Sequence, residues 1–281
     1  MELHVFLAVL FAALCHAGWN ALLKLRLEPL LALSLIAAAA GLVMVVAVPF
    51  VPLPPPEAWA YIAGSLAIHM VYYYALGEAY RTGDLGQVYP IARGAAPLMT
   101  ALGAWYWLGE ALGIYGWFGI AVLATGIMIL SLPSGTGATR FDVRAVGFAL
   151  LTALAISAYT LADGTGARIG SSALPYIVWL FVLDGLMMLL FGLVYYRRRF
   201  LTAFRQSWGL ILGGGALSAA AYAIAIWAMT QAPIALVAAL RETSVLFAAA
   251  IGVVVLHEPV RPIRIAAALL VMSGMLLLRL R

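Results

Sequence analysis

Residues 79–98 read AYRTGDLGQVYPIARGAAPL, and residues 227–246, which lie 148 positions later, read WAMTQAPIALVAALRETSVL. The two stretches are copies of one unit, because the same shift continues to match residues along both halves of the chain. The matched pairs are Thr82 and Thr230, Arg93 and Arg241, Leu98 and Leu246, Glu110 and Glu258, and Gly126 and Gly274. A duplicated hydrophobic unit predicts a carrier of small molecules, since two related halves create a central interface where a solute is exposed to each side of a bilayer in turn.

The composition places the chain in a membrane. Of its 281 residues, 65% are hydrophobic and 10% are charged, and the mean hydropathy is +1.06. A soluble domain carries about a quarter charged residues, so a water-soluble core could not bury this much apolar surface. Ten apolar runs are long enough for a helix to cross about 30 Å of hydrocarbon. They lie near 4–23, 30–50, 58–80, 85–107, 112–132, 145–165, 173–195, 208–228, 234–256 and 262–280.

The ten runs divide into two halves of five, which agrees with the repeat. We therefore expect a first repeat over residues 1–132, a linker over 133–144 and a second repeat over 145–281. The polar connections between the runs are too short to hold a separate catalytic domain. Walker, dinucleotide-binding and GxSxG motifs are absent, so the sequence predicts neither an enzyme nor an ATP-driven pump, and it calls for no cofactor and no metal.

The net charge of +5 is a topological signal, not a nucleic-acid patch, because the arginines flank the apolar runs. Most basic residues fall on one side of a ten-helix arrangement: Lys24, Arg26, Arg81, Arg140, Arg144, Arg197, Arg198, Arg199, Arg205, Arg261 and Arg264. The opposite side holds Arg168, Arg279 and Arg281. The positive-inside rule predicts that the more basic side is cytoplasmic and that both termini lie outside.

Short stretches that recur in both halves identify a family. They are Ala79 to Pro97, Leu108-Gly109-Glu110, Gly119, Gly126, Ala228 to Ser244, Leu256-His257-Glu258-Pro259 and Gly274. With these stretches the chain resembles the drug/metabolite transporter superfamily, specifically its EamA-type carriers, over nearly its whole length. The resemblance implies an all-α integral membrane protein whose ten transmembrane helices form two inverted five-helix repeats around a central cavity.

The resemblance also carries expectations about function and assembly. It implies export of amino acids or other metabolites, and a fifth and a tenth helix that serve packing or a homodimer. It implies cytoplasmic termini, which is the opposite of what the charge distribution predicts. We expect the protein in the inner (plasma) membrane of a bacterium, with the lipid bilayer and a small-molecule substrate as its partners and with no nucleic acid.

Polar residues deep in a membrane usually face a cavity and mark function, and the first apolar run holds three. His16, Trp19 and Asn20 are spaced at i, i+3 and i+4, which places an imidazole, an indole and an amide on one helix face. We expect this face to contact the solute. The alternative is that the three side chains satisfy one another or bind a neighbouring helix.

Tyr89 and Arg93 share a face of the fourth run, where Pro97 is expected to loosen the helix and open it toward a cavity. A planar guanidinium at Arg93 suits a carboxylate or a phosphonate. Arg241 occupies the corresponding place in the ninth run, beside Glu242. The alternative is a structural ion pair of either arginine with an acidic side chain. The candidates for such a pair are Glu78, Asp163, Asp184 and Glu242.

The sixth and third runs supply further candidates. Tyr159 and Asp163 lie at i and i+4, and Asp163 suits a substrate ammonium group. The alternative, which we favour for Asp163, is a carboxylate at the helix end paired with Arg168. The third run contributes Tyr73, from an aromatic group in mid-helix, and Glu78 nearer the helix end.

These residues together predict a secondary transporter that moves a small polar or zwitterionic metabolite, an amino acid or a close analogue, by alternating access. The anionic end would bind Arg93 or Arg241, the cationic end Glu78, Asp163 or Glu242, and the middle would be enclosed by Trp19, Tyr73, Tyr89 and Tyr159. A carboxylate or His16 would supply proton coupling, which a facilitator does not need.

Other readings of the sequence stay open. One is an exchanger of phosphorylated solutes or nucleotide sugars, since paired arginines bind phosphates as readily as carboxylates. Another is an exporter of organic cations or drugs. A membrane-embedded enzyme or a non-transporting membrane subunit is disfavoured by the doubled five-helix unit.

Overall fold

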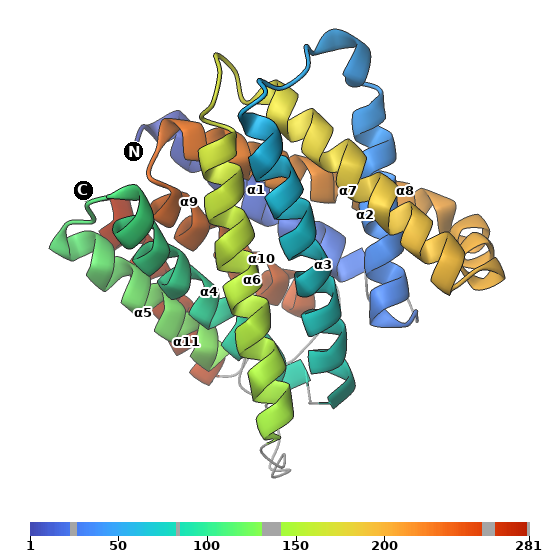
Figure 1. Cartoon of the computed structure of the whole chain (residues 1–281). Helices are drawn as coiled ribbons and strands as arrows, with labels where there is room; N and C mark the ends of the chain where they lie inside the picture. Colours follow the sequence, from blue (N-terminus) through green and yellow to red (C-terminus); the bar gives the residue numbers. More distant parts are fainter. Residues whose placement is uncertain (23–26, 83–84, 131–141, 255–261, 280–281) are drawn as a thin grey trace.

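The computed structural model describes residues 1–22, 27–82, 85–130, 142–254 and 262–279, and most of them are helical (Figure 1). In chain order the helices are α1 (Leu3–Leu22), α2 (Pro29–Val45), the short 3-10 helix η1 (Val48–Phe50), α3 (Ala58–Thr82), α4 (Leu85–Leu108), α5 (Ile114–Leu130), α6 (Val143–Gly166), α7 (Leu174–Tyr195), α8 (Arg198–Gln231), α9 (Ile234–Arg241), α10 (Ser244–Val254) and α11 (Pro262–Arg279). The described residues make ten membrane segments, because α9 and α10 are two halves of one. Helices satisfy their own backbone hydrogen bonds, which a segment in lipid requires.

The predicted apolar runs coincide with these helices, with two informative differences besides the division of the run over 234–256 into α9 and α10. The run over 30–50 ends as a helix at Val45, and its last residues form η1, which has a proline in its first turn. The helix over 208–228 starts earlier than its apolar run, because α8 begins at Arg198. Its backbone leaves helical geometry at Ser207, with φ −135° and ψ 27°, so the basic residues before Ser207 form a separate arm ahead of the span.

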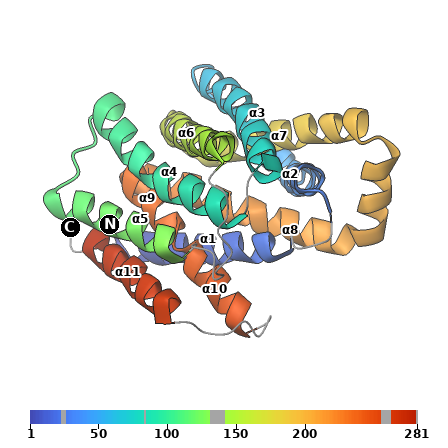
Figure 2. The ribbon, with the colours of Figure 1, turned by 90° about the horizontal axis from the view of Figure 1, so that it is seen from below.

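The helices pack in a pattern that repeats between the two halves. Helix α3 of the first repeat packs on α6 of the second, and the corresponding α8 of the second repeat packs on α1 of the first. In the same way α4 contacts α6, while α9 and α10 contact α1. The remaining helices pair with their own counterparts, α2 with α7 and α5 with α11, at opposite ends of the molecule (Figure 2). Helices α1 and α6 thus each pack against helices of the other repeat, and the interface between the repeats runs through the centre of the molecule.

Glycines set how closely the paired helices approach. A Cβ atom on Gly41 would lie 2.7 Å from the Cα of Gly185, and one on Gly274 would lie 2.8 Å from the carbonyl oxygen of Gly119. No side chain fits at such distances. Small residues at a membrane helix crossing let the two backbones touch, and this contact replaces the hydrophobic driving force that lipid does not supply.

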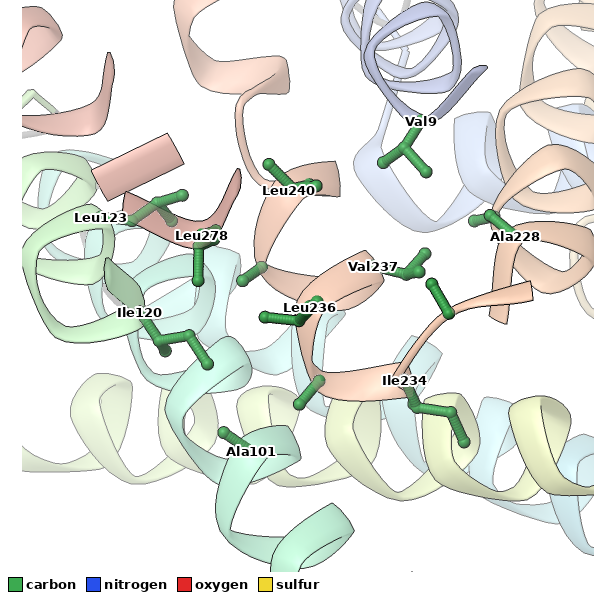
Figure 3. Close-up of a cluster of buried hydrophobic side chains, with 14 of the residues drawn as sticks. Val9, Ala101, Ile120, Leu123, Ala228, Ile234, Leu236, Val237, Leu240 and Leu278 are labelled. Carbon is green, nitrogen blue, oxygen red and sulfur yellow. The ribbon is translucent and has the colours of Figure 1, made fainter. Parts of the chain in front are cut away.

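Helix α9 lies inside the molecule and is surrounded by other helices. All eight of its residues are buried. The apolar side chains that enclose it come from α1, α4, α5, α8 and α11 (Figure 3). The residues labelled there are Val9, Ala101, Ile120, Leu123, Ala228 and Leu278, around Ile234, Leu236, Val237 and Leu240. The polar residues that follow α9 consequently emerge in the protein interior and not in lipid.

Candidate functional site

The ninth membrane segment is broken at its centre, over residues 241–244. At the break, the amide of Glu242 donates to the carbonyl of Ala239 at 3.1 Å, and that of Thr243 donates to Leu240 at 3.0 Å, which are three-residue spacings. The Thr243 hydroxyl also donates to the Leu240 carbonyl at 2.6 Å. Interrupted helices are tolerated at membrane depth only inside protein or beside a cavity, and transporters place their binding sites at such breaks.

This break differs from what the sequence led us to expect. The run over 234–256 reads as one continuous span, and Pro97 in α4 was the residue expected to open a helix. Helix α4 instead extends unbroken from Leu85 to Leu108 through Pro97. The usable signal in the ninth run is four consecutive polar residues, Arg241 to Ser244, because threonine and serine side chains compete for backbone hydrogen bonds.

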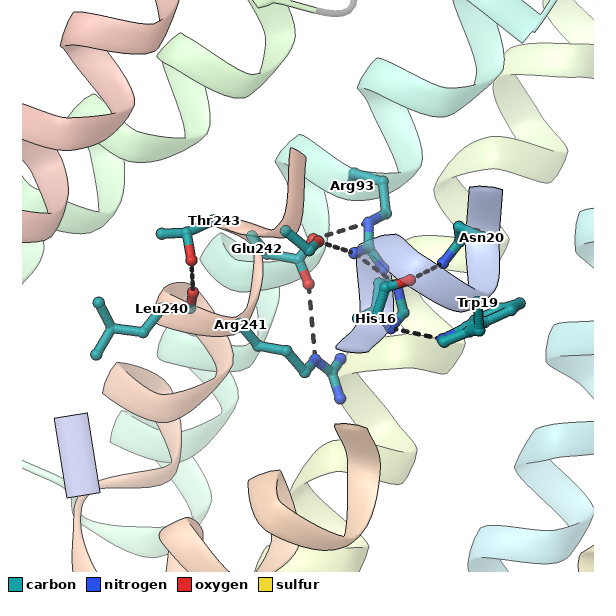
Figure 4. Close-up of polar contacts among 9 residues, drawn as sticks. His16, Trp19, Asn20, Arg93, Leu240, Arg241, Glu242 and Thr243 are labelled. Carbon is teal, nitrogen blue, oxygen red and sulfur yellow. Dashed lines mark hydrogen bonds and ion pairs between the residues drawn. The ribbon is translucent and has the colours of Figure 1, made fainter. Parts of the chain in front are cut away.

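Charged and polar side chains from α4 and the broken segment meet at the break (Figure 4). The Nε of Arg93 lies 2.8 Å from a carboxylate oxygen of Glu242, and its Nη2 donates to the Ser244 hydroxyl at 3.0 Å. Arg241 lies farther from Glu242, at 3.8 Å, and its guanidinium sits over the ring of Tyr222, 5.2 Å from the centroid. Two buried arginines thus share one glutamate, so the cluster retains an excess positive charge.

His16 joins this cluster to α1. Its Nε2 lies 3.1 Å from Nη2 of Arg93, and the indole of Trp19 donates to its Nδ1 at 3.3 Å. The amide of Asn20 donates to the His16 carbonyl at 2.8 Å. A neutral imidazole accepts at only one of its two nitrogens, so His16 cannot satisfy both ring donors at once. The spacing-based prediction of one polar face is consistent with this geometry, and so is its alternative of mutual contacts.

A cavity of about 100 Å³ lies beside the cluster, between the two repeats. Its walls come from α1 to α4 of the first repeat and from α6 to α9 of the second, and they are mainly aromatic and aliphatic. The lining residues are His16, Trp19, Leu33, Ile36, Ala37, Ala40, His69, Tyr72, Tyr73, Arg93, Tyr159, Leu180, Phe181, Asp184, Ser218, Ala221, Tyr222 and Arg241. An apolar wall with a few convergent polar groups is the usual form of a small-molecule site.

One acidic side chain in this wall is Asp184 of α7. The Tyr73 hydroxyl donates to one of its oxygens at 3.0 Å, and His69 Nδ1 lies 3.9 Å from the other. The His69 ring packs against Tyr159, with 4.4 Å between centroids. The cavity wall therefore also contains a carboxylate with aromatic rings beside it.

Asp163 is fully buried behind the cavity wall and has different partners from those expected. The hydroxyls of Tyr176 and Tyr222 donate to its two oxygens at 2.9 and 2.5 Å. The favoured pairing with Arg168 is wrong, because Asp163 points inward from α6 while Arg168 lies beyond the helix end and pairs with Glu110. Asp163 thus fixes the position of the Tyr222 phenol, and the guanidinium of Arg241 lies over the ring of that tyrosine.

The pair of Arg168 and Glu110 links the two repeats on the side of the molecule where α4 and α8 end. Arg168 lies 3.1 Å from Glu110 and donates to the carbonyls of Met229 and Ala232 at 2.9 and 3.0 Å. Glu110 also accepts from the amides of Ile234 at 2.9 Å and Ala235 at 3.3 Å, which caps the N-terminus of α9. A loop of the first repeat is thereby attached to two helices of the second.

The structure brings most of the predicted site residues together. Six of them line the cavity: His16, Trp19, Tyr73, Arg93, Tyr159 and Arg241. Asn20 and Glu242 contact members of this group, His16 and Arg93 respectively. Asp163 accepts a hydrogen bond from Tyr222, which also lines the cavity. Glu78 lies at the end of α3 beside Arg81, at 2.6 Å, and is not among the described cavity residues. The side chain of Tyr89 lies outside the described part of the chain.

Sequence reasoning missed several lining residues, and Asp184 is the most important. It appeared only as a possible ion-pair partner for an arginine. The available signal was its position as a lone charge in the middle of the run over 173–195, which is where an intramembrane ionisable group marks function. His69, Tyr72 and Tyr222 could not be oriented without knowing how α3 and α8 pack.

Comparison with known proteins adds the family. The model of the EamA-like transporter family matches residues 3–132 and, separately, residues 143–280. The chain belongs to the EamA-like transporter family. This transporter also superposes on a solved crystal structure with a TM-score of 0.77, covering 100% of this chain and 98% of the other, at 17% sequence identity. Such a low identity shows a shared fold and nothing about the substrate.

Family membership confirms the predicted class. This EamA-like transporter is an all-helical integral membrane protein of the drug/metabolite transporter superfamily, with ten membrane helices in two repeats. Five described segments are long and apolar enough to cross a membrane by themselves, and three shorter apolar helices accompany them. Membership also indicates a transporter. In the ranges that the structure describes, no group of three His, Cys, Asp or Glu side chains is arranged to hold a metal ion.

Proposed function

We propose that this protein is a secondary transporter of a small zwitterionic metabolite, an amino acid or a close analogue, and that it works by alternating access. The observation that carries the proposal is the cavity between the repeats, which has Arg241 in its wall at a broken membrane helix. A guanidinium is a suitable ligand for the carboxylate that every amino acid carries.

Arg241 fits this role better than Arg93. Glu242 lies 2.8 Å from Arg93 but 3.8 Å from Arg241, so Arg93 is the better neutralised of the two. The Nε of Arg241 is buried and forms no hydrogen bond to any described residue. A carboxylate that enters the cavity would supply this missing acceptor. Arg93 would then act mainly by holding Glu242 and the broken segment in place.

The cavity favours an amino acid over the two alternatives in the same superfamily. Sites for drug-sized ligands have volumes of about 300–1,000 Å³, whereas this cavity has about 100 Å³, which is small for a nucleotide sugar or a drug. One excess positive charge at Arg93, Arg241 and Glu242 suits a monoanionic carboxylate better than a phosphate dianion. A phosphorylated-solute exchanger and an organic-cation exporter remain the competing candidates for the test below.

Further parts of the proposal rest on resemblance. Export from the cell, and residence in the inner membrane of a bacterium, are proposed because EamA-type carriers behave in this way. Proton coupling is proposed as an optional property, since a buried histidine and buried carboxylates adjoin the cavity. A homodimer through α5 and α11 is likewise a proposal.

The test is an exchange assay with purified protein in liposomes. Separate vesicle batches are preloaded with pooled unlabelled amino acids, with sugar phosphates and nucleotide sugars, or with quaternary ammonium compounds. Uptake of the corresponding labelled solute is then measured with and without a pH gradient. The proposal predicts saturable exchange with the amino acids alone, and acceleration by the gradient would show proton coupling. Exchange confined to phosphorylated solutes or to organic cations would contradict it.

A further inference from the structure

Asp184 is an ionisable residue at the centre of a membrane helix. It lies midway along α7, next to Gly185, where α7 crosses α2 at Gly41. A carboxylate at this depth is costly, on the order of 2.5–3.5 kcal/mol on insertion scales, and such groups mark substrate or ion pathways. Its side chain is only 12% exposed, and that exposure is to the cavity between the repeats. The position therefore calls for a functional explanation.

The partners of Asp184 leave it incompletely satisfied. Oδ2 accepts a hydrogen bond from Tyr73, but Oδ1 is buried with no hydrogen-bond partner, and Nδ1 of His69, which is cationic only when protonated, is 3.9 Å away. Within the described residues no lysine or arginine lies at ion-pair distance from it. A carboxylate accepts several hydrogen bonds, so Asp184 has capacity for a donor that the protein does not provide.

The surroundings of Asp184 suit a compact organic cation. Tyr72 and Tyr73 contact each other edge to face, and Tyr72 also contacts Tyr159, with centroids 5.3 and 5.8 Å apart. Phe181 precedes Asp184 by one helical turn and lines the same cavity. Aromatic faces attract ammonium groups, and the attraction grows when water is excluded. The wall thus combines one under-satisfied carboxylate with several rings.

We propose that Asp184, oriented by Tyr73 and adjoined by His69, is the subsite for the ammonium group of the substrate, in the same cavity as the carboxylate subsite at Arg241. The inference rests on the proposed function, because it assigns the second charge of the same zwitterion. It replaces Glu78, Asp163 and Glu242 as the candidates for this role. Asp163 is occupied by two tyrosines, Glu242 by two arginines, and Glu78 by Arg81.

The test compares two solutes that differ only in the ammonium group. One is the amino acid that wild-type protein exchanges fastest in the liposome panel, and the other is the carboxylic acid with the same carbon skeleton and hydrogen in place of the ammonium group. Wild-type protein should prefer the amino acid. In Asp184→Asn this preference should fall about 10- to 100-fold, the range for a hydrogen bond to a charged group, while exchange of the carboxylic acid persists and shows that the variant is folded.

Two further variants separate the subsite from a structural role. Tyr73→Phe removes the hydrogen bond but keeps the charge, so it should retain most of the preference. Glu78→Gln is the matched control on α3 and should retain all of it. Unchanged preference in Asp184→Asn, or a loss in Glu78→Gln instead, would overturn the subsite. Failure of wild-type protein to exchange any amino acid would contradict the proposed function itself and remove the basis for the subsite with it.

Discussion

Replacement of Glu110 by alanine should open the side of the transporter where α4 and α8 end. Glu110 belongs to the loop after α4 in the first repeat, and it binds the amides of Ile234 and Ala235 at the start of α9 in the second repeat. It also pairs with Arg168, which reaches the end of α8. Under the proposed alternating access, these contacts break when the two repeats separate on this side, so they should stabilise only the state that is closed there.

The magnitude follows from the contacts that are lost. A side chain that caps a helix N-terminus contributes about 1 kcal/mol, and a negative charge at that position adds about 0.3–1 kcal/mol. The pair with the partly exposed Arg168 adds less than about 1 kcal/mol because solvent screens it. The sum is about 2 kcal/mol, which shifts the equilibrium between the two access states by about 30-fold at 1.4 kcal/mol per tenfold.

Cysteine labelling measures this shift directly. Cys15 is the sole cysteine and is buried, so it can be replaced by alanine and a reporter introduced by Ala232→Cys. Ala232 is 7% exposed and its carbonyl binds Arg168. A membrane-impermeant thiol reagent should label this position up to about 30-fold faster in Glu110→Ala than in the parent. The control is Glu57→Ala, which removes an exposed acid from the same side of the molecule.

An unchanged labelling rate in Glu110→Ala, in protein that remains monodisperse and folded, would refute the reasoning. It would mean that the contacts of Glu110 persist in both access states or contribute no net free energy. Acceleration by Glu57→Ala to the same extent would also refute it, because the effect would then come from net charge and not from the cap of α9.

Two other predictions concern stability, which is measured by unfolding in detergent. Glu242→Gln leaves the buried guanidinium of Arg93 without its carboxylate and should lower the free energy of unfolding by about 3–5 kcal/mol; an unchanged value would show that the pair is not structural. Gly41→Leu forces a side chain against Gly185 and should destabilise the protein by at least about 1–3 kcal/mol. The control is Gly64→Leu, because a Cβ atom on Gly64 meets no atom within 4 Å. This replacement should change the free energy of unfolding by less than about 0.5 kcal/mol. Equal effects of the two glycine replacements would contradict the account of the α2 and α7 crossing.

The fold was predictable because its signals are spread over the whole chain. The ten apolar runs and the repeat at a shift of 148 residues can be recognised without knowledge of contacts. Both signals remain clear when the predicted helix ends are wrong by a few residues. The break after Arg241 was not predictable in the same way. It contains neither proline nor glycine, and it forms where the packing around α9 brings four polar residues into the interior, whereas the prolines of α4 are accommodated without interruption.

The site was predictable only in part, for a related reason. The spacing of His16, Trp19 and Asn20 describes one face of one helix, so it could be read from the sequence. The role of Asp184 depends on the rotation of α7, which is fixed by the contact of Gly185 with Gly41 in another helix. The hydrogen bond from the Ile234 amide at the start of α9 to Glu110 joins residues 124 positions apart, and no local sequence pattern predicts such a contact.

The central claim is that a solute binds through its carboxylate to Arg241 in the cavity between the repeats. The most direct test is the rate of amino-acid exchange by Arg241→Gln in liposomes, compared with Arg144→Gln, which removes an exposed arginine from the first turn of α6. Arg241→Gln leaves the pair of Arg93 and Glu242 in place, so loss of function would not reflect an unpaired glutamate. The account predicts that exchange is lost in Arg241→Gln and kept in Arg144→Gln. Full exchange by Arg241→Gln would contradict it.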